Sequence, residues 1–312
     1  MAYPLLTVGV AAGAALCLVL GANNISICSG LAMSSRAIRY KHAVVLAAVG
    51  LMTGAILEGG KMAGAVSGIA PGSGVEVFLA AVVGTFVVMG FLTLPGLPIS
   101  LTEVFVGGIA GATVAHAGAL NIAFTLRVVI SWFLAPIAGL VVAALISLAT
   151  RICARTIRRV ILLNKAYTSL TIVAGFYSSY VLGASGIGLV AGGINVAAGL
   201  RPWILLGLGA AGVAGMALFG RATTRSVAEN IVGLNMPGAM AAQLAGAFVV
   251  HGFTEVGIPV SITEAVVGGV FGAAVPRKLV VRNSRLIRRL LLGWTTAPLL
   301  CFFLAFGLVR IL

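Results

Sequence analysis

Long apolar runs, separated by short polar and basic groups, recur along the whole chain. They include residues 43–66, 75–94, 128–149, 204–219 and 290–309. A helix needs roughly 20 mostly apolar residues to cross the hydrocarbon core of a bilayer. The pattern therefore predicts an all-α fold with about eight to ten membrane-spanning helices.

The composition indicates that lipid, not water, covers most of the surface. Hydrophobic residues make up 61% of the chain, charged residues only 8%, and the mean hydropathy is +1.18. A soluble domain carries roughly 25% charged residues. We therefore expect an integral, multi-pass protein of the cell membrane. The first four residues carry no basic side chain, so we expect the chain to start with a helix of the mature protein and not with a cleaved signal peptide.

The net charge is strongly positive, at +14 from 20 basic and six acidic residues, and all six acids are glutamates. The bases form short clusters between apolar runs, within residues 36–41, 151–165, 221–225 and 277–289. Such clusters are typical of loops on the cytoplasmic side, and one or two arginines could also contact an anionic substrate. The expected partners are membrane lipid and a small anion, and not nucleic acid.

The chain contains one unit twice. Residues 97–112 read LPISLTEVFVGGIAGA, and residues 258–273 read IPVSITEAVVGGVFGA, with nine of 16 positions identical at an offset of 161. Two further pairs lie 162 residues apart: GANN at 21–24 with GASG at 183–186, and Trp132 with Trp294. These anchors predict a first transmembrane repeat over 1–152, a basic linker over 153–162 and a second repeat over 163–312.

Each repeat has the same predicted layout. A first helix is broken by a Gly/Asn/Ser segment, two long apolar helices follow, and the Pro-x-Ser-x-Thr-Glu segment leads to a last helix that contains tryptophan. Matched interruptions in two halves of a membrane protein indicate a transporter binding site near the bilayer midplane.

The repeated Pro-x-Ser-x-Thr-Glu segment is the candidate site. Pro98 is predicted to begin a helix, which places Ser100 and Thr102 in the first turn, where backbone N–H groups lack intrahelical partners. Ser261 and Thr263 repeat the arrangement. Two such helix starts facing each other would hold one small oxyanion. The alternative is an ordinary capped helix start with no ligand.

The polar residues of the first interruption, Asn23, Asn24, Ser26 and Ser29, lie in an otherwise apolar stretch. In hydrocarbon they need a cavity or hydrogen-bond partners. They could therefore line the same site, or they could hold helices together by hydrogen bonds.

With these motifs the chain resembles the inorganic phosphate transporter (PiT) family. The first family signature, G-A-N-D-V-A-N-A-x-G, is similar to GANNISICSG at 21–30, and the second, P-V-S-T-T-H, is similar to PISLTE at 98–103 and PVSITE at 259–264. The resemblance implies two inverted repeats, each with a broken first helix and a re-entrant helical hairpin. It also implies cation-coupled symport of inorganic phosphate, or of sulfate, with no cofactor.

The resemblance also implies which residues bind the anion and which couple it to an ion. The substrate would lie among Asn23, Asn24, Ser100, Thr102, Ser185, Ser261 and Thr263. The chain departs from the family where Asn24 replaces the signature aspartate, a natural sodium ligand, and where Glu103 and Glu264 replace its histidine. Carboxylates beside an anion repel it unless they carry protons. The coupling ion is thus proton or sodium. Glu103 and Glu264 are the proton candidates, or they only cap their helices or pair with an arginine or lysine.

Other charged residues are predicted to have structural roles. Glu58 and Lys61, one helical turn apart, are expected to form an ion pair. Glu229 and Glu255 are similar candidates. His251 is expected to be a hydrogen-bonded interior residue and not a metal ligand, so no metal site is predicted.

Three other functions are compatible with the sequence. A sulfate permease of the same family is one, an anion channel is another, and a membrane-embedded lipid-diphosphate phosphatase is a third. Such an enzyme needs a base, a nucleophile and usually an arginine clamp, and neither Pro-x-Ser-x-Thr-Glu segment contains an arginine. We therefore expect a transporter and not an enzyme, as a monomer or a homodimer.

Overall fold

The computed structural model describes residues 2–34, 37–93, 99–116, 118–156, 159–198, 201–221, 223, 234–277 and 284–311, and within these ranges the regular structure is entirely helical. Seven helical stretches in the described residues are long and apolar enough to cross a membrane. The sequence led us to expect eight to ten spans, so the number found in the described residues is lower. Two further apolar helices, Leu101–Ala115 and Ile262–Ala274, are shorter than these spans.

The two halves contain matching elements in the same order. The first half consists of α1 (Ala2–Leu20), η1 (Gly21–Ile25), α2 (Ser26–Ser34), α3 (Tyr40–Ile69), α4 (Val75–Thr93), α5 (Leu101–Ala115) and α6 (Ile122–Thr156). The second consists of α7 (Val160–Leu182), η2 (Gly183–Ile187), α8 (Gly188–Ala198), α9 (Pro202–Phe219), α11 (Met236–Glu255), α12 (Ile262–Ala274), η3 (Val275–Arg277) and α13 (Ser284–Ile311). The predicted linker 153–162 is formed largely by the ends of α6 and α7.

The interruption of each first helix is a π-helical segment, so the helix widens for one turn without a gap. The segments η1 and η2 lie 162 residues apart and are fully buried. Each starts with a glycine, and a Cβ atom there would overlap the backbone of another helix, at Gly212 for Gly21 and at Leu51 for Gly183. Single π-helical turns are frequent at functional sites, because they re-aim the backbone and side chains locally.

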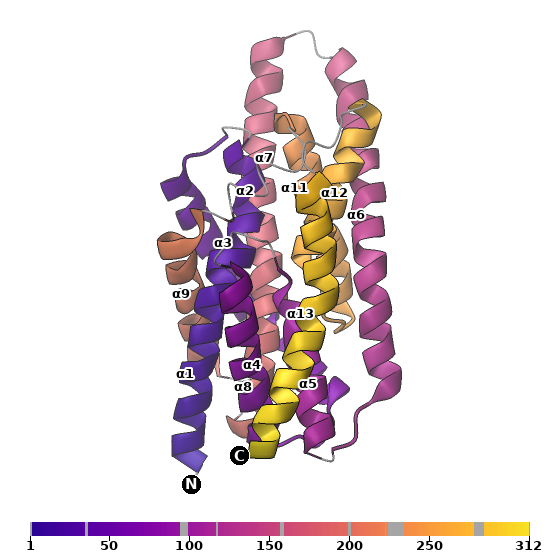
Figure 1. The fold of residues 1–312 in the computed structure, drawn as a ribbon. Helices are drawn as coiled ribbons and strands as arrows, with labels where there is room; N and C mark the ends of the chain where they lie inside the picture. The colour runs from indigo at the N-terminus through magenta and orange to yellow at the C-terminus, as the bar shows by residue number, and fades with distance from the viewer. Residues whose placement is uncertain are drawn as a thin grey trace.

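Equivalent helices of the two halves run in opposite directions. In Figure 1, α1 rises from the N-terminus at the lower end, whereas its counterpart α7 starts at the upper end and descends. The short helix α5 lies in the lower part of the bundle and α12 in the upper part. This arrangement agrees with inverted repeats. We call α4 with α5 hairpin 1 and α11 with α12 hairpin 2.

The hairpins are held by the opposite half of the molecule. Helix α5 packs most extensively on α13, and α12 packs on α6. The contact depends on small residues, because a Cβ atom at Gly107 or Gly111 would overlap the carbonyl of Pro298 or Phe302. The second half repeats this packing with Gly268 and Gly272 against Pro136 and Leu140. Small residues four apart let helix backbones approach closely in membranes.

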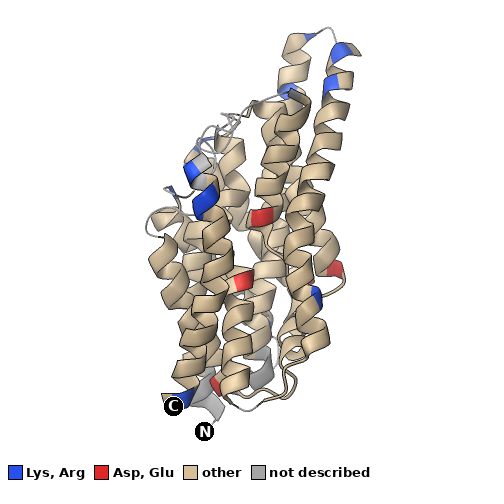
Figure 2. Cartoon of the chain, turned by 45° about the vertical axis from the view of Figure 1, so that its right-hand side comes forward, with Lys and Arg blue, Asp and Glu red and all other residues tan. Residues whose placement is uncertain are grey.

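The charged residues are distributed unevenly along the bundle. Figure 2 shows most of the lysine and arginine residues toward the end opposite the two termini, with few charges along the body. The positive-inside rule assigns such an end to the cytoplasm. The start of α13, which contains Arg285, Arg288 and Arg289, lies at this end together with the end of α6 and the start of α7.

Candidate functional site

Both short helices begin with a serine cap. Ser100 Oγ accepts a hydrogen bond from the backbone N–H of Glu103 at 3.3 Å, and Ser261 Oγ accepts one from Glu264 at the same distance. The helices therefore start at Leu101 and Ile262, after the serines. The predicted start at the proline is wrong in hairpin 2, where Pro259 precedes the helix; Pro98 lies outside the described residues.

The caps leave unpaired backbone donors at both helix starts. The first N–H groups of a helix have no intrahelical acceptor, and each serine satisfies only one of them. The N–H groups of the first two helical residues, Leu101 and Thr102 in α5, remain for a ligand, at the positive end of the helix dipole. The Ser261 hydroxyl still has its own proton to donate, and that of Ser100 lies within reach of the Glu103 carboxyl group.

The π-helical segment of the first half meets the tips of both hairpins. Asn23 Oδ1 accepts a hydrogen bond from the backbone N–H of Ile99 at 3.0 Å. Asn24 Nδ2 donates to the carbonyl of Ile99 at 3.3 Å and to Thr263 Oγ1 at 3.0 Å. The tips also touch each other, because Thr102 Oγ1 donates to the carbonyl of Val260 at 3.4 Å. Asparagines and threonines from three distant segments thus form one cluster.

Six of the seven predicted substrate-binding residues lie on these segments. The seventh, Ser185 in η2, donates to the carbonyl of Val181 in its own helix at 2.8 Å and is not connected to the hairpin tips by a hydrogen bond among the described residues. All seven side chains are buried, and the most exposed, Thr102, is 8% accessible. In this structure the site is closed, because its asparagine, threonine and serine side chains form hydrogen bonds with protein atoms.

One buried acceptor in this cluster has no partner. Asn24 Oδ1 forms no hydrogen bond with any residue that the structure describes, although its residue is only 3% exposed. The orientation of the amide is fixed, because the carbonyl of Ile99 can only accept and must face Nδ2. A buried unsatisfied carbonyl oxygen costs free energy, which a ligand that donates a hydrogen bond would recover.

The two glutamates lie on a different side of the hairpin tips. Glu103 and Glu264 line a cavity of about 450 Å³, together with Trp132 of α6 and Trp294 of α13. The carboxyl groups are near enough to interact. Both indole nitrogens have no hydrogen-bond partner among the described residues, whereas the carboxyl group of Glu103 lies within reach of that of Glu264 and of the Ser100 hydroxyl. The cavity, which opens to the surface of the bundle beside exposed side chains such as Phe133 and Leu291, thus combines two acid groups and two N–H donors in largely apolar surroundings.

The two tryptophans were not expected from the sequence to belong to a site. Trp132 and Trp294 marked the repeat, and their 162-residue offset nearly equals that of the hairpins. That match was the available signal, because residues that occupy equivalent places in two halves can meet at the interface between them. The lining of the cavity by both tryptophans and both glutamates is such a meeting.

A second polar cluster lies on α3 and α11. The predicted pair of Glu58 and Lys61 is present at 3.3 Å, and Glu255 Oε1 lies 2.6 Å from Lys61 Nζ. His251 Nε2 is 2.8 Å from Glu58 Oε2 and 3.1 Å from Glu255 Oε1. The expectation from the sequence that His251 has no second ligand at helical spacing is wrong, because Glu255 lies one helical turn after it. Glu229 lies outside the described residues.

These features define a class of membrane protein. Two matched halves, each with a π-helical interruption and a hairpin, meet at a buried polar cluster built from helix starts, which is the architecture of a secondary transporter. The model of the family described as "Phosphate transporter family" matches residues 20–168 and again residues 154–305. The chain belongs to this family.

Individual relatives cover nearly the whole chain. A protein of Methanocaldococcus jannaschii named "Putative phosphate permease" is 24% identical over 94% of this chain and 93% of its own length. The sulfate permease CysP of Bacillus subtilis is 25% identical over 94% of this chain and 84% of its own length. These relatives are permeases, which agrees with the prediction that the chain is not an enzyme.

A solved structure has the same fold. The protein titled "The sodium-dependent phosphate transporter" matches with a TM-score of 0.89, covering 99% of this chain and 98% of that chain at 18% identity. The match confirms the predicted all-α membrane fold.

Proposed function

We propose that the protein is a secondary transporter that moves inorganic phosphate across the cell membrane together with a cation. The observation that carries the proposal is the convergence of Asn24, Thr263 and the Ile99 backbone at two capped helix starts. Helix starts with free N–H groups, hydroxyls and amides are suited to a small oxyanion. Membership in the phosphate transporter family supports the same substrate.

The anion would replace hydrogen bonds that now close the site. The bonds from Asn24 to Thr263 and from Thr102 to Val260 join the two hairpin tips directly or through η1. A phosphate between the tips would accept from these side chains and from the serine hydroxyls. Ser185 would join them once its hydroxyl turns away from the carbonyl of Val181. Exchange of internal for ligand hydrogen bonds keeps the cost of opening small.

Phosphate fits this cluster better than sulfate does. Near neutral pH phosphate carries at least one P–OH group, whereas sulfate has no proton to donate. Asn24 Oδ1 is a buried acceptor without a partner and would take that hydrogen bond. The sulfate permease among the relatives makes sulfate the second candidate, and the hydroxyl and amide donors of the cluster would serve either anion.

Protons are the coupling ion that the residues favour. Asn24 stands where the family signature has aspartate, so a carboxylate ligand for sodium is missing there. Glu103 and Glu264 instead form a buried carboxyl pair beside the tryptophan-lined cavity, with no cationic partner in the part of the chain that the structure describes. Two adjacent carboxyl groups repel each other when both are ionised, so the pair is suited to share a proton. The sodium-dependent structural neighbour keeps sodium as the alternative.

Uptake by the purified protein in liposomes tests the proposal. Radiolabelled phosphate is supplied outside, and an inward proton gradient and an inward sodium gradient are imposed separately. We expect accumulation with the proton gradient and competition by unlabelled phosphate at lower concentrations than by sulfate. Accumulation that depends only on sodium would overturn proton coupling. Accumulation of sulfate but not of phosphate would overturn the substrate.

A further inference from the structure

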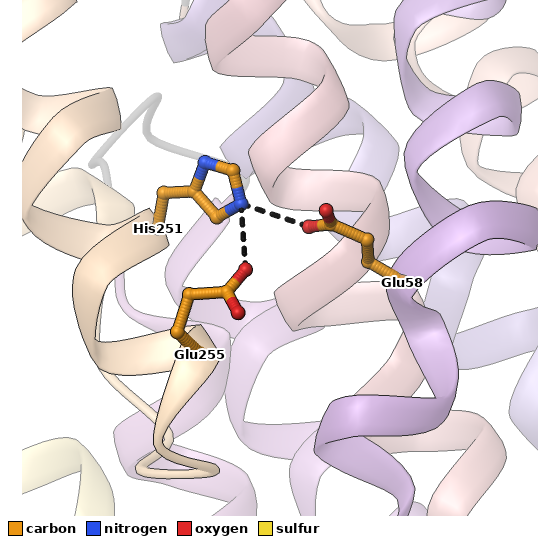
Figure 3. A group of neighbouring side chains, drawn as sticks. All are labelled: Glu58, His251 and Glu255. Atoms are coloured by element: carbon orange, nitrogen blue, oxygen red, sulfur yellow. Dashed lines mark hydrogen bonds and ion pairs between the residues drawn. The ribbon is translucent and has the colours of Figure 1, made fainter.

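The cluster on α3 and α11 has the composition of a metal site. Figure 3 shows the imidazole of His251 between the carboxylates of Glu58 and Glu255, with Nε2 facing both. The distances from Nε2 are 2.8 Å to Glu58 Oε2 and 3.1 Å to Glu255 Oε1. One potential ligand atom from each of the three residues lies within 4.8 Å of the others.

These spacings suit a zinc ion. Zinc binds imidazole nitrogen and carboxylate oxygen at about 2.0–2.2 Å, so ligand atoms around a tetrahedral ion are about 3.3 Å apart. The two distances from His251 Nε2, 2.8 Å to Glu58 Oε2 and 3.1 Å to Glu255 Oε1, need to lengthen by only a few tenths of an ångström to admit one. Three protein ligands with a fourth position for water is a common zinc arrangement. The side chains are 18%, 22% and 48% exposed, so an ion can reach them.

The second nitrogen of the imidazole is already held. His251 Nδ1 lies 2.6 Å from the hydroxyl of Tyr177 on α7. A histidine that binds a metal through one ring nitrogen nearly always forms a hydrogen bond through the other. This hydrogen bond fixes the orientation of the ring and raises the basicity of the metal-binding nitrogen. Without an ion, the Glu58 carboxylate accepts a hydrogen bond from Nε2–H, and in the neutral tautomer this leaves Nδ1 to accept one from Tyr177. With an ion, Nε2 would release its proton and Nδ1–H would donate to Tyr177.

Lys61 occupies the place of a cation. Its ammonium lies 3.3 Å from Glu58 Oε1 and 2.6 Å from Glu255 Oε1, and its side chain is 38% exposed. Two carboxylates and one ammonium leave one negative charge in excess. A divalent ion would neutralise both carboxylates if the flexible lysine side chain swung outward. Lys61 is therefore a tethered competitor for the site.

The cluster is not a general requirement for folding a hairpin. In the first half the positions equivalent to Tyr177, His251 and Glu255 are Ala15, Gly90 and Leu94, none of which can bind a metal. A largely apolar cavity of about 510 Å³, lined by Ala15 and Gly90 among others, lies there instead. Among the described residues, hairpin 1 thus packs against its neighbours without ionic contacts at this place, and the ligand set occurs beside hairpin 2 alone.

We propose that Glu58, His251 and Glu255 form a binding site for a divalent transition metal ion, represented by Zn²⁺, which ties the turn of hairpin 2 to α3. Glu255 ends α11, and two residues later Gly257, with φ 69°, lies beside the backbone carbonyl of Lys61. An ion that bridges α3 and α11 here would hold this turn. This consequence rests on the proposed function: if hairpin 2 must move during transport, the bound ion slows transport.

Calorimetric titration of Zn²⁺ into the purified full-length protein in detergent tests the site without any need for transport. We expect one ion per chain. His251→Ala and Glu255→Gln should weaken binding at least about tenfold, and Tyr177→Phe about tenfold. Lys61→Ala should tighten binding, because it removes the competitor, whereas a purely structural lysine would not produce a gain. His116→Ala, on an exposed histidine at the end of α5, is the control and should change nothing.

Several results would overturn the site. These are no zinc binding by the wild type, binding that survives His251→Ala in a variant with unchanged thermal unfolding, or Lys61→Ala binding no tighter than the wild type. Phosphate uptake should slow with Zn²⁺ in the wild type and not in His251→Ala; equal slowing in both contradicts the link to hairpin 2. If no variant transports phosphate at all, the proposed function fails while the calorimetry still decides the metal site.

Discussion

Asn24 Nδ2 donates a hydrogen bond to Thr263 Oγ1 at 3.0 Å, although 239 residues separate them in the chain. The bond joins the π-helical segment of the first half to the tip of hairpin 2. The same amide group bonds to Ile99 at the tip of hairpin 1. One asparagine therefore links both hairpin tips, and the hairpins cannot separate at this point without breaking its bonds.

Asn24→Asp should change both the rate of uptake and its dependence on ions. A carboxylate cannot donate to Ile99 or Thr263, and it adds a negative charge where the anion would lie. We expect phosphate uptake without sodium to fall by about tenfold or more, as for the loss of a buried hydrogen bond. Sodium should restore part of it, because carboxylate oxygen is a suitable ligand for a hard cation.

The control for this substitution is Asn235→Asp. Asn235 caps α11 by accepting a hydrogen bond from Gly238, and aspartate caps a helix as well as asparagine does. Uptake is measured in liposomes with sodium or with choline. Equal uptake by Asn24→Asp and wild type in both media would contradict a role of Asn24 at the anion.

Thr102→Val and Thr263→Val should each raise the phosphate concentration needed for half-maximal uptake. Valine keeps the shape of threonine and removes the hydroxyl donor. A hydrogen bond to a charged group contributes about 1.5–3 kcal/mol, so the expected shift is roughly tenfold or more. Thr113→Val is the control, because Thr113 is also buried on α5 but donates to Ile109 in its own helix. An equal shift in all three variants would mean that only packing is being measured.

The order of the elements could be predicted from the sequence, and two features of their packing could not. The offset of 161–162 residues revealed the repeat, because equivalent positions in the two halves have similar residues. The π-helical form of residues 21–25 has no hydrophobic signature, since one widened turn leaves the apolar pattern nearly unchanged. The packing of α5 on α13, a helix of the other half, is a long-range contact that no local sequence pattern specifies. Gly107 and Gly111 indicated only that some helix approaches α5 closely.

For the site, the residue types were predictable and their directions were not. Thr102 and Glu103 are successive helical residues, so their side chains point about 100° apart. The threonine contacts Val260 of hairpin 2, and the glutamate faces the cavity with Trp132. Only the packing of α5 in the folded protein decides which of these two side chains faces hairpin 2 and which faces the cavity. The spacing of His251 and Glu255 was readable, but the approach of Glu58 from another helix was not.

Glu103→Gln combined with Glu264→Gln should separate phosphate exchange from proton-driven accumulation. Glutamine resembles a protonated glutamate, so the double variant mimics the form that carries protons. We expect exchange of labelled for unlabelled phosphate to continue, and accumulation driven by an inward proton gradient to be lost. Glu76→Gln, on an exposed glutamate in the first turn of α4, is the control and should keep both activities. Accumulation retained by the double variant would rule out this pair as the proton carrier.

Gly107→Ala and Gly268→Ala should destabilise the fold through a steric clash between the two halves. A Cβ atom at Gly107 would overlap the backbone carbonyl of Pro298, and one at Gly268 that of Pro136, and neither backbone can move aside as a flexible side chain could. Overpacking costs typically about 1–3 kcal/mol. At Gly207 in α9 a Cβ atom meets nothing within 4 Å, so Gly207→Ala should be neutral or slightly stabilising, because alanine favours helix. Thermal unfolding in detergent measures all three. Unfolding temperatures for Gly107→Ala and Gly268→Ala equal to that of Gly207→Ala would show that α5 and α12 are not held against α13 and α6 as described.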